Sequence, residues 1–161
     1  MKRLLLVRHA KSSWKHSSLP DHERPLNRRG ERNRWQLGAY LREHPAPLQR
    51  IDCSTAVRAR LTAEAIAAQT PLREAAALYT FARDALIDYL RNLDNSLTCI
   101  ALVGHNPALT ELANWLECSP TGIDNLPTAS LIEFELSIGH WAQVGPGCAK
   151  RLRLQRVRQL P

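Results

Sequence analysis

Two histidines directly follow short apolar runs, where side chains at strand ends can take part in chemistry. Arg8 and His9 come after RLLLV at 3–7. His105 follows one glycine after TCIALV at 98–103. Uninterrupted apolar runs of this length are typical of strands that are buried on both faces in a parallel sheet. Because ligands of such sheets bind beyond the carboxyl ends of the strands, we expect both histidines at one ligand-binding edge.

A third fragment, STAVRARLTAE at 54–64, places Arg58 in the first turn of an expected helix. A helix N-terminus offers free N–H groups and the positive end of the helix dipole, and an arginine adds a full charge with a fork of donors. This combination favours a phosphate dianion as the ligand. His9 is the available nucleophile, because no cysteine lies in an anion-binding loop and no carboxylate cluster has metal-ligand spacing.

The arginines also favour the ionisation state that a nucleophilic imidazole needs. An imidazole attacks phosphorus only when one ring nitrogen is unprotonated, and Arg8 and Arg58 disfavour the charged form of His9 by like-charge repulsion. His105 is able to donate a hydrogen bond to an equatorial oxygen as charge develops there in the transition state. The candidate catalytic residues are therefore Arg8, His9, Arg58 and His105, of which all but His9 also bind the substrate.

Expected strands alternate with expected helices along the chain. We expect helices from Asn27 to EHPAP at 43–47, over 56–69, between 80 and 94, and after Asn106 with Pro107 as the first helical residue, and strands at 3–7, 50–53, 98–103, 130–136, 140–144 and 149–157. The alternation of Leu131, Glu133 and Glu135 with apolar neighbours predicts a strand near a sheet edge with one wetter face. The overall rhythm predicts an α/β fold, with a mainly parallel sheet and helices on both faces.

Length and composition are consistent with one domain spanning 1–161. The 161 residues are 44% hydrophobic, enough to bury a core without disulfides. The four cysteines are far apart and form no CxxC pair, which favours a reducing cytoplasm. The first apolar run is too short for a signal peptide, and no window is long enough to span a membrane. We therefore expect a cytoplasmic monomer without a membrane partner.

Five segments together resemble a known family: LVRHAKSSW at 6–14, RPLNRRG at 24–30, STAVRARLTAE at 54–64, LVGHNPAL at 102–109 and LPTAS at 126–130. In their order they are similar to the signature segments of the histidine phosphatase superfamily, specifically its SixA-type phosphohistidine phosphatase branch. The resemblance implies a three-layer phosphoglycerate mutase-like fold. It also implies that His9 accepts a phosphoryl group, that Arg8, Arg58 and His105 bind it, and that no metal or other cofactor is needed. The implied partner is a phosphorylated protein or a small phosphorylated substrate.

Two features depart from the family pattern. Leu61 stands where members often carry a glutamine, which we expect to alter packing rather than chemistry. Thr80 stands in a region where a glutamate often supplies the leaving-group proton, and Asn106 replaces the aspartate of the acid-histidine-aspartate branch. No general acid can be named from the pattern, and three carboxylates remain candidates: Asp21, Glu23 and Asp84. Because the imidazole of a phosphohistidine leaves more easily than an alkoxide, the missing acid favours phosphoramidate or activated aryl substrates over sugar phosphates.

Other interpretations remain open. The same chemistry also suits a phosphatase of a small phosphorylated metabolite. A basic nucleic-acid-binding domain would explain the net charge of +7 and the basic stretch at 150–158, but not the two strand-end histidines, and an interleaved aromatic platform is missing. A zinc module is disfavoured, because His9 and His105 have no further ligands at the required spacing. Arg24 is undecided, Asn27 and Gly30 are interpreted as helix-start residues, and the remaining histidines are expected to be exposed: His16, His22, His44 and His140.

Overall fold

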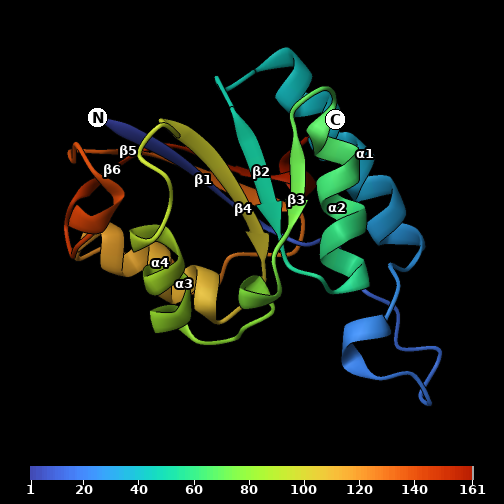
Figure 1. Ribbon diagram of the computed structural model, residues 1–161. Coiled ribbons are helices and arrows are strands. Elements are labelled where there is room, and N and C mark those ends of the chain that lie inside the picture. The colour runs from blue at the N-terminus through green and yellow to red at the C-terminus, as the bar shows by residue number, and fades with distance from the viewer. Residues whose placement is uncertain (161) are drawn as a thin grey trace.

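A six-stranded sheet forms the centre of the computed structural model, which describes residues 1–160 (Figure 1). Its strands are β1 (Lys2–Arg8), β2 (Arg50–Cys53), β3 (Leu72–Glu74), β4 (Cys99–Gly104), β5 (Ser130–Leu136) and β6 (Ala149–Arg156). Across the sheet they follow the order β3-β2-β4-β1-β5-β6. The pairs from β3 to β1 are parallel, whereas β5 pairs antiparallel with both β1 and β6. The expected α/β fold with a mainly parallel sheet is confirmed.

Two helices cover each face of the sheet (Figure 1). On one face lie α1 (Arg28–Glu43) and α2 (Val57–Ala67), and on the other lie α3 (Arg83–Arg91) and α4 (Ala108–Glu117). In β1, Leu4 and Leu6 pack in the core beneath α3 and α4, while Leu5 and Val7 pack beneath α1 and α2. Since successive strand residues point to opposite faces, burial on both sides accounts for the uninterrupted apolar run.

The start of α1 ties the first loop to the sheet edge. The Asn27 side chain accepts a hydrogen bond from the Gly30 N–H at 2.8 Å, and so caps the helix. The Asn27 N–H in turn donates to the carbonyl oxygen of Lys11 at 3.0 Å. A Cβ atom on Gly30 would lie 2.1 Å from that same oxygen, so only glycine fits there. The interpretation of Asn27 and Gly30 as helix-start residues is confirmed, and the contact holds the segment after His9 in place.

Two local predictions are wrong. HWAQV is not a strand: Trp141–Gln143 is a 3₁₀ helix whose Trp141 ring is fully buried. The β5 strand lies next to the edge strand β6, in agreement with the prediction of a strand near a sheet edge. It is not wet on one face, however, because the Glu133 carboxylate is buried between Arg3 and Arg153 at 2.8 and 3.1 Å. The polar residue in the alternating pattern of β5 is therefore part of a buried ion-pair network and does not face solvent. The two arginines supply the positive charge that a buried carboxylate needs.

The start of α4 also differs from expectation. The helix begins at Ala108, and Pro107 is the N-cap residue rather than the first helical one. Asn106 lies one residue earlier, although its side-chain oxygen still accepts a hydrogen bond from the Thr110 N–H at 3.1 Å. The strand β3 and a 3₁₀ helix at Asp21–Glu23 were not predicted from the sequence. Both are too short to show a periodic pattern.

Candidate active site

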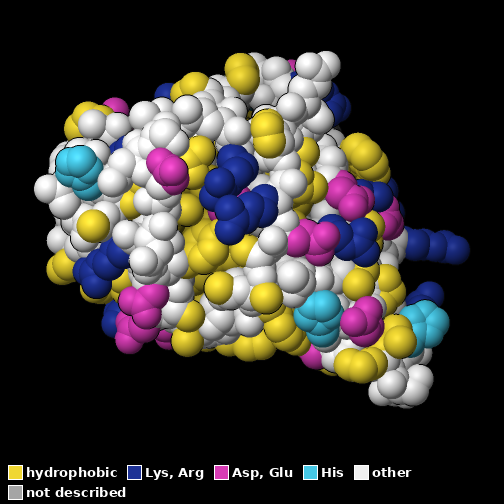
Figure 2. Space-filling model, in the orientation of Figure 1, with side chains coloured by type: hydrophobic (Ala, Val, Ile, Leu, Met, Phe, Trp, Pro, Cys, Tyr) yellow, Lys and Arg dark blue, Asp and Glu magenta, His cyan; other side chains and the backbone are white. Residues whose placement is uncertain are grey.

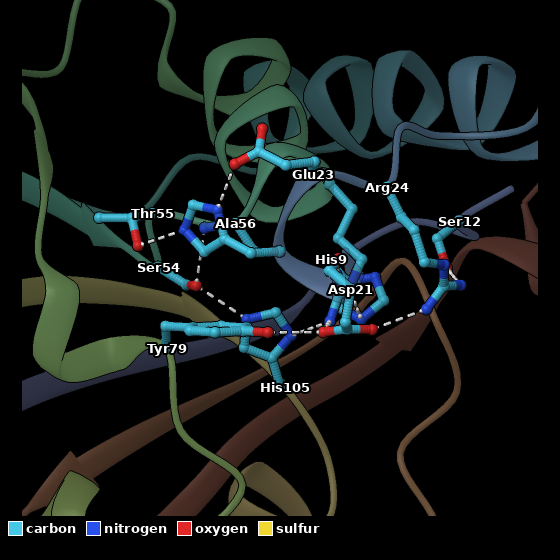
Figure 3. Close-up of polar contacts among 12 residues, drawn as sticks. His9, Ser12, Asp21, Glu23, Arg24, Ser54, Thr55, Ala56, Tyr79 and His105 are labelled. Carbon is cyan, nitrogen blue, oxygen red and sulfur yellow. Dashed lines mark hydrogen bonds and ion pairs between the residues drawn. The ribbon is translucent and has the colours of Figure 1, made fainter. Parts of the chain in front are cut away.

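The two strand-end histidines meet at the carboxyl edge of the sheet. The strands β1 and β4 are parallel neighbours with Arg8 opposite Gly104, so the residues that follow them emerge side by side. The ring centroids of His9 and His105 lie 5.1 Å apart (Figure 3). Both histidines are buried. The sheet thus brings together two side chains that lie far apart in the sequence, at the edge where ligands of such sheets bind.

Arg58 lies in the first turn of α2 and points between the two rings. Its Nε is 3.4 Å from Nε2 of His9, and its Nη2 is 3.4 Å from Nδ1 of His105. The side chain is almost fully buried, so its charge is poorly screened by water. One guanidinium group therefore contacts both imidazoles, in a position where it is able to hold an anion against either ring.

The hydrogen bonds of His9 define which of its nitrogens carries the proton. Nδ1 lies 2.7 Å from the carbonyl oxygen of Ala10, which only accepts, so Nδ1 carries the hydrogen. Nε2 then keeps its lone pair and faces Arg58. The pKa of His9 is lowered to about 3, mainly by burial; the hydrogen bond to Ala10 opposes this change, and the positive charges of Arg58, Arg8 and Arg24 add to it. The neutral form is as expected, but burial rather than arginine repulsion is its main cause.

His105 is held in the complementary tautomer. Because Arg58 only donates, Nδ1 of His105 is the acceptor, and Nε2 carries the hydrogen and donates to the Ser54 hydroxyl at 2.8 Å. The same hydroxyl oxygen accepts from the Ala56 N–H at 3.1 Å, at the start of α2. The pKa of His105 is lowered to about 3, mainly by burial, with contributions from His9 and Arg58. Both imidazoles are therefore neutral, and arginines supply the positive charge of the site.

Around these residues lies a cleft of about 310 Å³, which we call the catalytic cleft. Arg8 lines it while donating to the carbonyl oxygen of Leu126 at 2.8 Å. Arg24, which the sequence left undecided, also lines it, and its Nε donates to the carbonyl oxygen of Ser13 at 3.1 Å. The Arg24 guanidinium stacks 3.3 Å above the Trp14 ring. Three arginines therefore converge on the cleft, and backbone or aromatic contacts fix the orientation of Arg8 and Arg24.

The carboxylate of Asp21 pairs with two of these arginines. It lies 2.9 Å from Arg58, 2.9 Å from Arg24 and 2.7 Å from the Tyr79 hydroxyl (Figure 3). Desolvation raises the pKa of Asp21, but hydrogen bonds from Tyr79 and Arg58 outweigh it and lower the pKa to about 2. The ionised carboxylate shows how these groups hold an oxyanion. It also shows that Asp21 carries no proton to donate in this arrangement.

The other two candidate acids lie farther from the reaction centre. Glu23 accepts from His22 at 3.0 Å, and His22 in turn contacts Thr55 at 2.8 Å, so His22 is not the exposed residue that the sequence predicts. Asp84 has a side chain that is 80% exposed, pairs with the adjacent Arg83 and does not line the catalytic cleft. His16, His44 and His140 are exposed, as expected.

Several residues in or beside the cleft were not singled out from the sequence. Ser54 directly follows β2, so the strand-end rule that located the histidines would have found it. Tyr79 and Trp14 lie in irregular segments, where no periodic pattern predicts the direction of a side chain. Asp21, named above as a candidate acid, lies in a short 3₁₀ helix, and its contacts with the arginines were not predicted. Within residues 1–160, no three His, Cys, Asp or Glu side chains are grouped in a way that would hold a metal ion. None of the helices there combines the length and the apolarity needed to cross a membrane.

Comparisons with known proteins agree with this architecture. Residues 4–80 match the histidine phosphatase superfamily (branch 1). The uncharacterized protein Rv1276c of Mycobacterium tuberculosis is 35% identical over 152 residues, which cover 89% of this chain and 94% of that protein. The chain therefore belongs to the histidine phosphatase superfamily.

Solved structures show the same fold at lower identity. A SixA protein from Nakamurella multipartitia superposes with a TM-score of 0.84 at 24% identity, covering 96% of this chain and 95% of that one. The protein histidine phosphatase SixA in complex with tungstate gives a TM-score of 0.79 at 17% identity and covers 99% of both chains. These matches confirm the expected phosphoglycerate mutase-like architecture.

Proposed function

We propose that this protein is a phosphatase that hydrolyses phosphohistidine in a protein substrate, through a phosphoryl intermediate on His9. One observation carries the proposal: Nε2 of His9 is unprotonated and lies 3.4 Å from the guanidinium of Arg58, with the His105 ring beside it. A nucleophile without a proton and a fixed cation at hydrogen-bond distance are what attack on a phosphate dianion requires. The family and the SixA-like fold support the same reaction.

The reaction has two balanced steps. First, the Nε2 lone pair of His9 forms a bond to phosphorus and the bond from phosphorus to the substrate imidazole breaks. The substrate imidazole, protonated on its other ring nitrogen, leaves with the electron pair as a neutral ring, and the phosphorylated His9 ring keeps its Nδ1 proton. Second, water attacks the phosphoryl group on His9, which releases inorganic phosphate and restores the free imidazole. Arg8, Arg24 and Arg58 surround the position where the phosphoryl oxygens would lie, and they neutralise the charge that these oxygens carry in both transition states.

His105 changes its role when substrate enters. In the ligand-free arrangement its Nδ1 accepts from Arg58 and its Nε2–H donates to Ser54. A phosphoryl group that displaces the Asp21 carboxylate would recruit Arg58, which frees the His105 ring to reorient and donate to an equatorial oxygen. The Ser54 hydroxyl is then able to satisfy the other ring nitrogen as donor or acceptor. His105 is therefore assigned to transition-state stabilisation rather than to nucleophilic attack.

The walls of the cleft support a planar leaving group. Trp14 and Phe81 line it and are 77% and 49% exposed, which is unusual for large aromatic side chains. The Phe81 ring also lies 5.4 Å from the His105 ring. Aromatic faces at the mouth of a phosphate site suit an imidazole or aryl group better than a hydroxyl-rich sugar. None of the candidate acids is placed to protonate an alkoxide, and such a group would need that proton.

Substrate comparison tests this proposal. We expect the purified protein to turn over a phosphohistidine peptide and an aryl phosphate faster than a sugar phosphate at equal concentration. The His9→Ala variant should lose all three activities, whereas His16→Ala, which removes an exposed histidine, should keep them. A clear preference for the sugar phosphate would contradict the proposal and favour a phosphatase of a small metabolite.

The surface charge favours a phosphorylated substrate over nucleic acid as partner. On the face shown in Figure 2, Lys and Arg side chains form separate groups with acidic side chains among them, rather than one continuous basic stripe. In the basic stretch at 150–158, Arg151 pairs with Glu117 at 2.7 Å and Arg153 pairs with Glu133 at 3.1 Å. Part of that positive charge therefore stabilises the fold and is not available to a phosphate backbone.

A further inference from the structure

A second basic hollow lies beside the catalytic cleft, between the start of α1 and the end of β6. It measures about 270 Å³. Six of the residues that line it matter here: Arg29, Arg32, Thr128, Ser130, Arg156 and Arg158. We call it the arginine cleft. No acidic side chain of residues 1–160 lines it. Its size is enough for one phosphate or pyrophosphate group with part of the molecule that carries it.

The arginines of this cleft lack ion-pair partners within residues 1–160. This contrasts with β6 itself, where Arg151 and Arg153 both pair with glutamates. Arg29 and Arg32 also lie in the first turns of α1, near the positive end of the helix dipole, which disfavours a cation. Unpaired guanidinium groups repel each other and the positive end of the helix dipole. An anion that binds among them would offset this repulsion.

Two buried polar atoms at the cleft are also unsatisfied. Ser130 and Arg156 face each other in the pairing of β5 with β6. The Ser130 hydroxyl, in a residue with no exposed surface, and Nε of Arg156 are both buried without a hydrogen-bond partner. Buried polar groups nearly always have such a partner. Neither ion pairing nor strand pairing within the described chain explains these two groups, whereas an oxyanion in the cleft offers acceptors near them.

The arginine cleft adjoins the catalytic cleft. Thr128 lines both hollows. One residue further on, the Ala129 N–H donates to the carbonyl oxygens of Arg8 and His9 at 3.1 and 3.0 Å, and Ser130 pairs with Arg8 across β5 and β1. The short segment 128–130 therefore forms the wall between the two hollows and connects to the backbone of the nucleophile. A single ligand with two anionic groups is able to reach both.

We propose that the arginine cleft is a second anion-binding site, which binds a phosphate group carried by the same substrate whose reacting phosphoryl group lies at His9. The link between the two clefts rests on the proposed phosphatase function, but anion binding in the arginine cleft does not. The same site would bind either a free oxyanion or a second phosphate group of the substrate. Two measurements distinguish these sources.

The first measurement is calorimetric titration with inorganic pyrophosphate. We expect two sites in the wild type, one in Arg58→Gln, which disables the catalytic cleft, and one in the double variant Arg29→Gln, Arg156→Gln. Each of these cleft arginines should contribute about a tenfold change in affinity, as a charge-assisted hydrogen bond does. Arg28→Gln is the matched control, because Arg28 is equally exposed on the same helix turn but does not line the cleft. Thermal melting curves show whether each variant is folded.

The second measurement compares the hydrolysis of an aryl monophosphate with that of an aryl substrate carrying a second phosphate group. The Arg29→Gln, Arg156→Gln variant should raise KM for the bisphosphate about a hundredfold, since each arginine contributes about tenfold, and leave the monophosphate unchanged. An effect on pyrophosphate binding without this change in KM would assign the site to a free oxyanion. A single pyrophosphate site in the folded wild type that is lost in Arg58→Gln and unchanged in the double variant would overturn the proposal. If no substrate is hydrolysed, the phosphatase function fails, but the titration still decides about the anion site.

Discussion

The catalytic cleft and the arginine cleft are both lined by arginines, but the arginines have different surroundings in the two clefts. In the catalytic cleft, Arg58 and Arg24 both contact the Asp21 carboxylate, and Arg8 donates to a backbone carbonyl. In the arginine cleft, none of the arginines has an acidic partner within residues 1–160. Partners fix the guanidinium groups where reacting atoms must be placed accurately. Without partners, the cations keep their full charge for an incoming anion but are less rigidly oriented.

The largest expected effect comes from Arg58, whose removal should abolish the function of one cleft and spare the other. Arg58→Ala should reduce kcat/KM for an aryl phosphate by about 10²–10³, the range for loss of one transition-state donor in a buried site. Arg60→Ala is the matched control, because Arg60 lies on the same helix but forms an i,i+4 pair with Glu64. Steady-state kinetics measures both. Equal losses in the two variants would show that Arg58 has no special place in the site.

A pH series tests whether the histidines are neutral, so that arginines alone supply the positive charge. Burial lowers the pKa of His9 and of His105 to about 3. Unfolded histidines titrate near pH 6.5, so between about pH 6.5 and 3 the unfolded chain binds more protons and stability falls as pH decreases. Each histidine should cost up to about 1.4 kcal/mol of unfolding free energy per pH unit in that window.

Urea denaturation at about pH 7 and about pH 5 measures this dependence, on the two sides of the unfolded histidine pKa. The double variant His9→Gln, His105→Gln should lose most of the stability difference between the two conditions. The double variant His16→Gln, His140→Gln should retain it, since both residues are exposed. The same pH dependence in all three proteins would mean that other groups cause it.

Asp21 provides a sharper test of what partners do in the catalytic cleft. The Asp21→Asn variant removes the charge that competes with phosphate for Arg58 and Arg24. The inhibition constant of inorganic phosphate should therefore decrease about threefold to fivefold, as an exposed ion pair is worth about 1 kcal/mol. Glu23→Gln, on the same 3₁₀ helix, should have no such effect. A large decrease in kcat with an unchanged inhibition constant would instead make Asp21 a proton donor.

The smallest expected effect concerns the unpaired cations of the arginine cleft. Without a ligand, Arg32→Gln should stabilise the protein by about 0.3–1 kcal/mol, because it removes a cation near the N-terminus of α1. Arg34→Gln on the same helix breaks a pair with Glu31 at 2.9 Å and should not stabilise it. Urea denaturation with and without pyrophosphate measures both variants. Pyrophosphate should reverse the advantage of Arg32→Gln, and destabilisation by this substitution without ligand would contradict the account.

Much of the architecture follows from local sequence patterns. Leu5 and Leu6 point to opposite faces of β1, and both are apolar, which predicts a strand that is covered on both faces. Strands of this kind bind ligands beyond their carboxyl ends, which locates the edge at which His9 and His105 meet. Glu133 misled the prediction of β5, because its partners Arg3 and Arg153 come from other strands and a sequence pattern does not show such pairing.

The remaining parts of the site depend on tertiary contacts. Asp21 and Tyr79 lie in segments without periodicity. The packing of the first loop beside α2 brings Asp21 to Arg58, and Tyr79 reaches Asp21 from a separate segment of the chain. The pKa of His9 is also set mainly by burial, and the extent of burial cannot be predicted from the arginines near His9 in the sequence. Positions of strand-end residues are therefore predictable, whereas loop contributions and ionisation states require the folded structure.

The most direct test of the central claim is to quench the reaction during turnover of an aryl phosphate whose phosphoryl group is radiolabelled, and to map the residue that carries the label. The account predicts a base-stable, acid-labile phosphoryl group on His9 of the wild type. It also predicts that the His9→Ala variant carries no such group. A protein that turns over substrate without any label on His9, or with the label on another residue, would contradict the account.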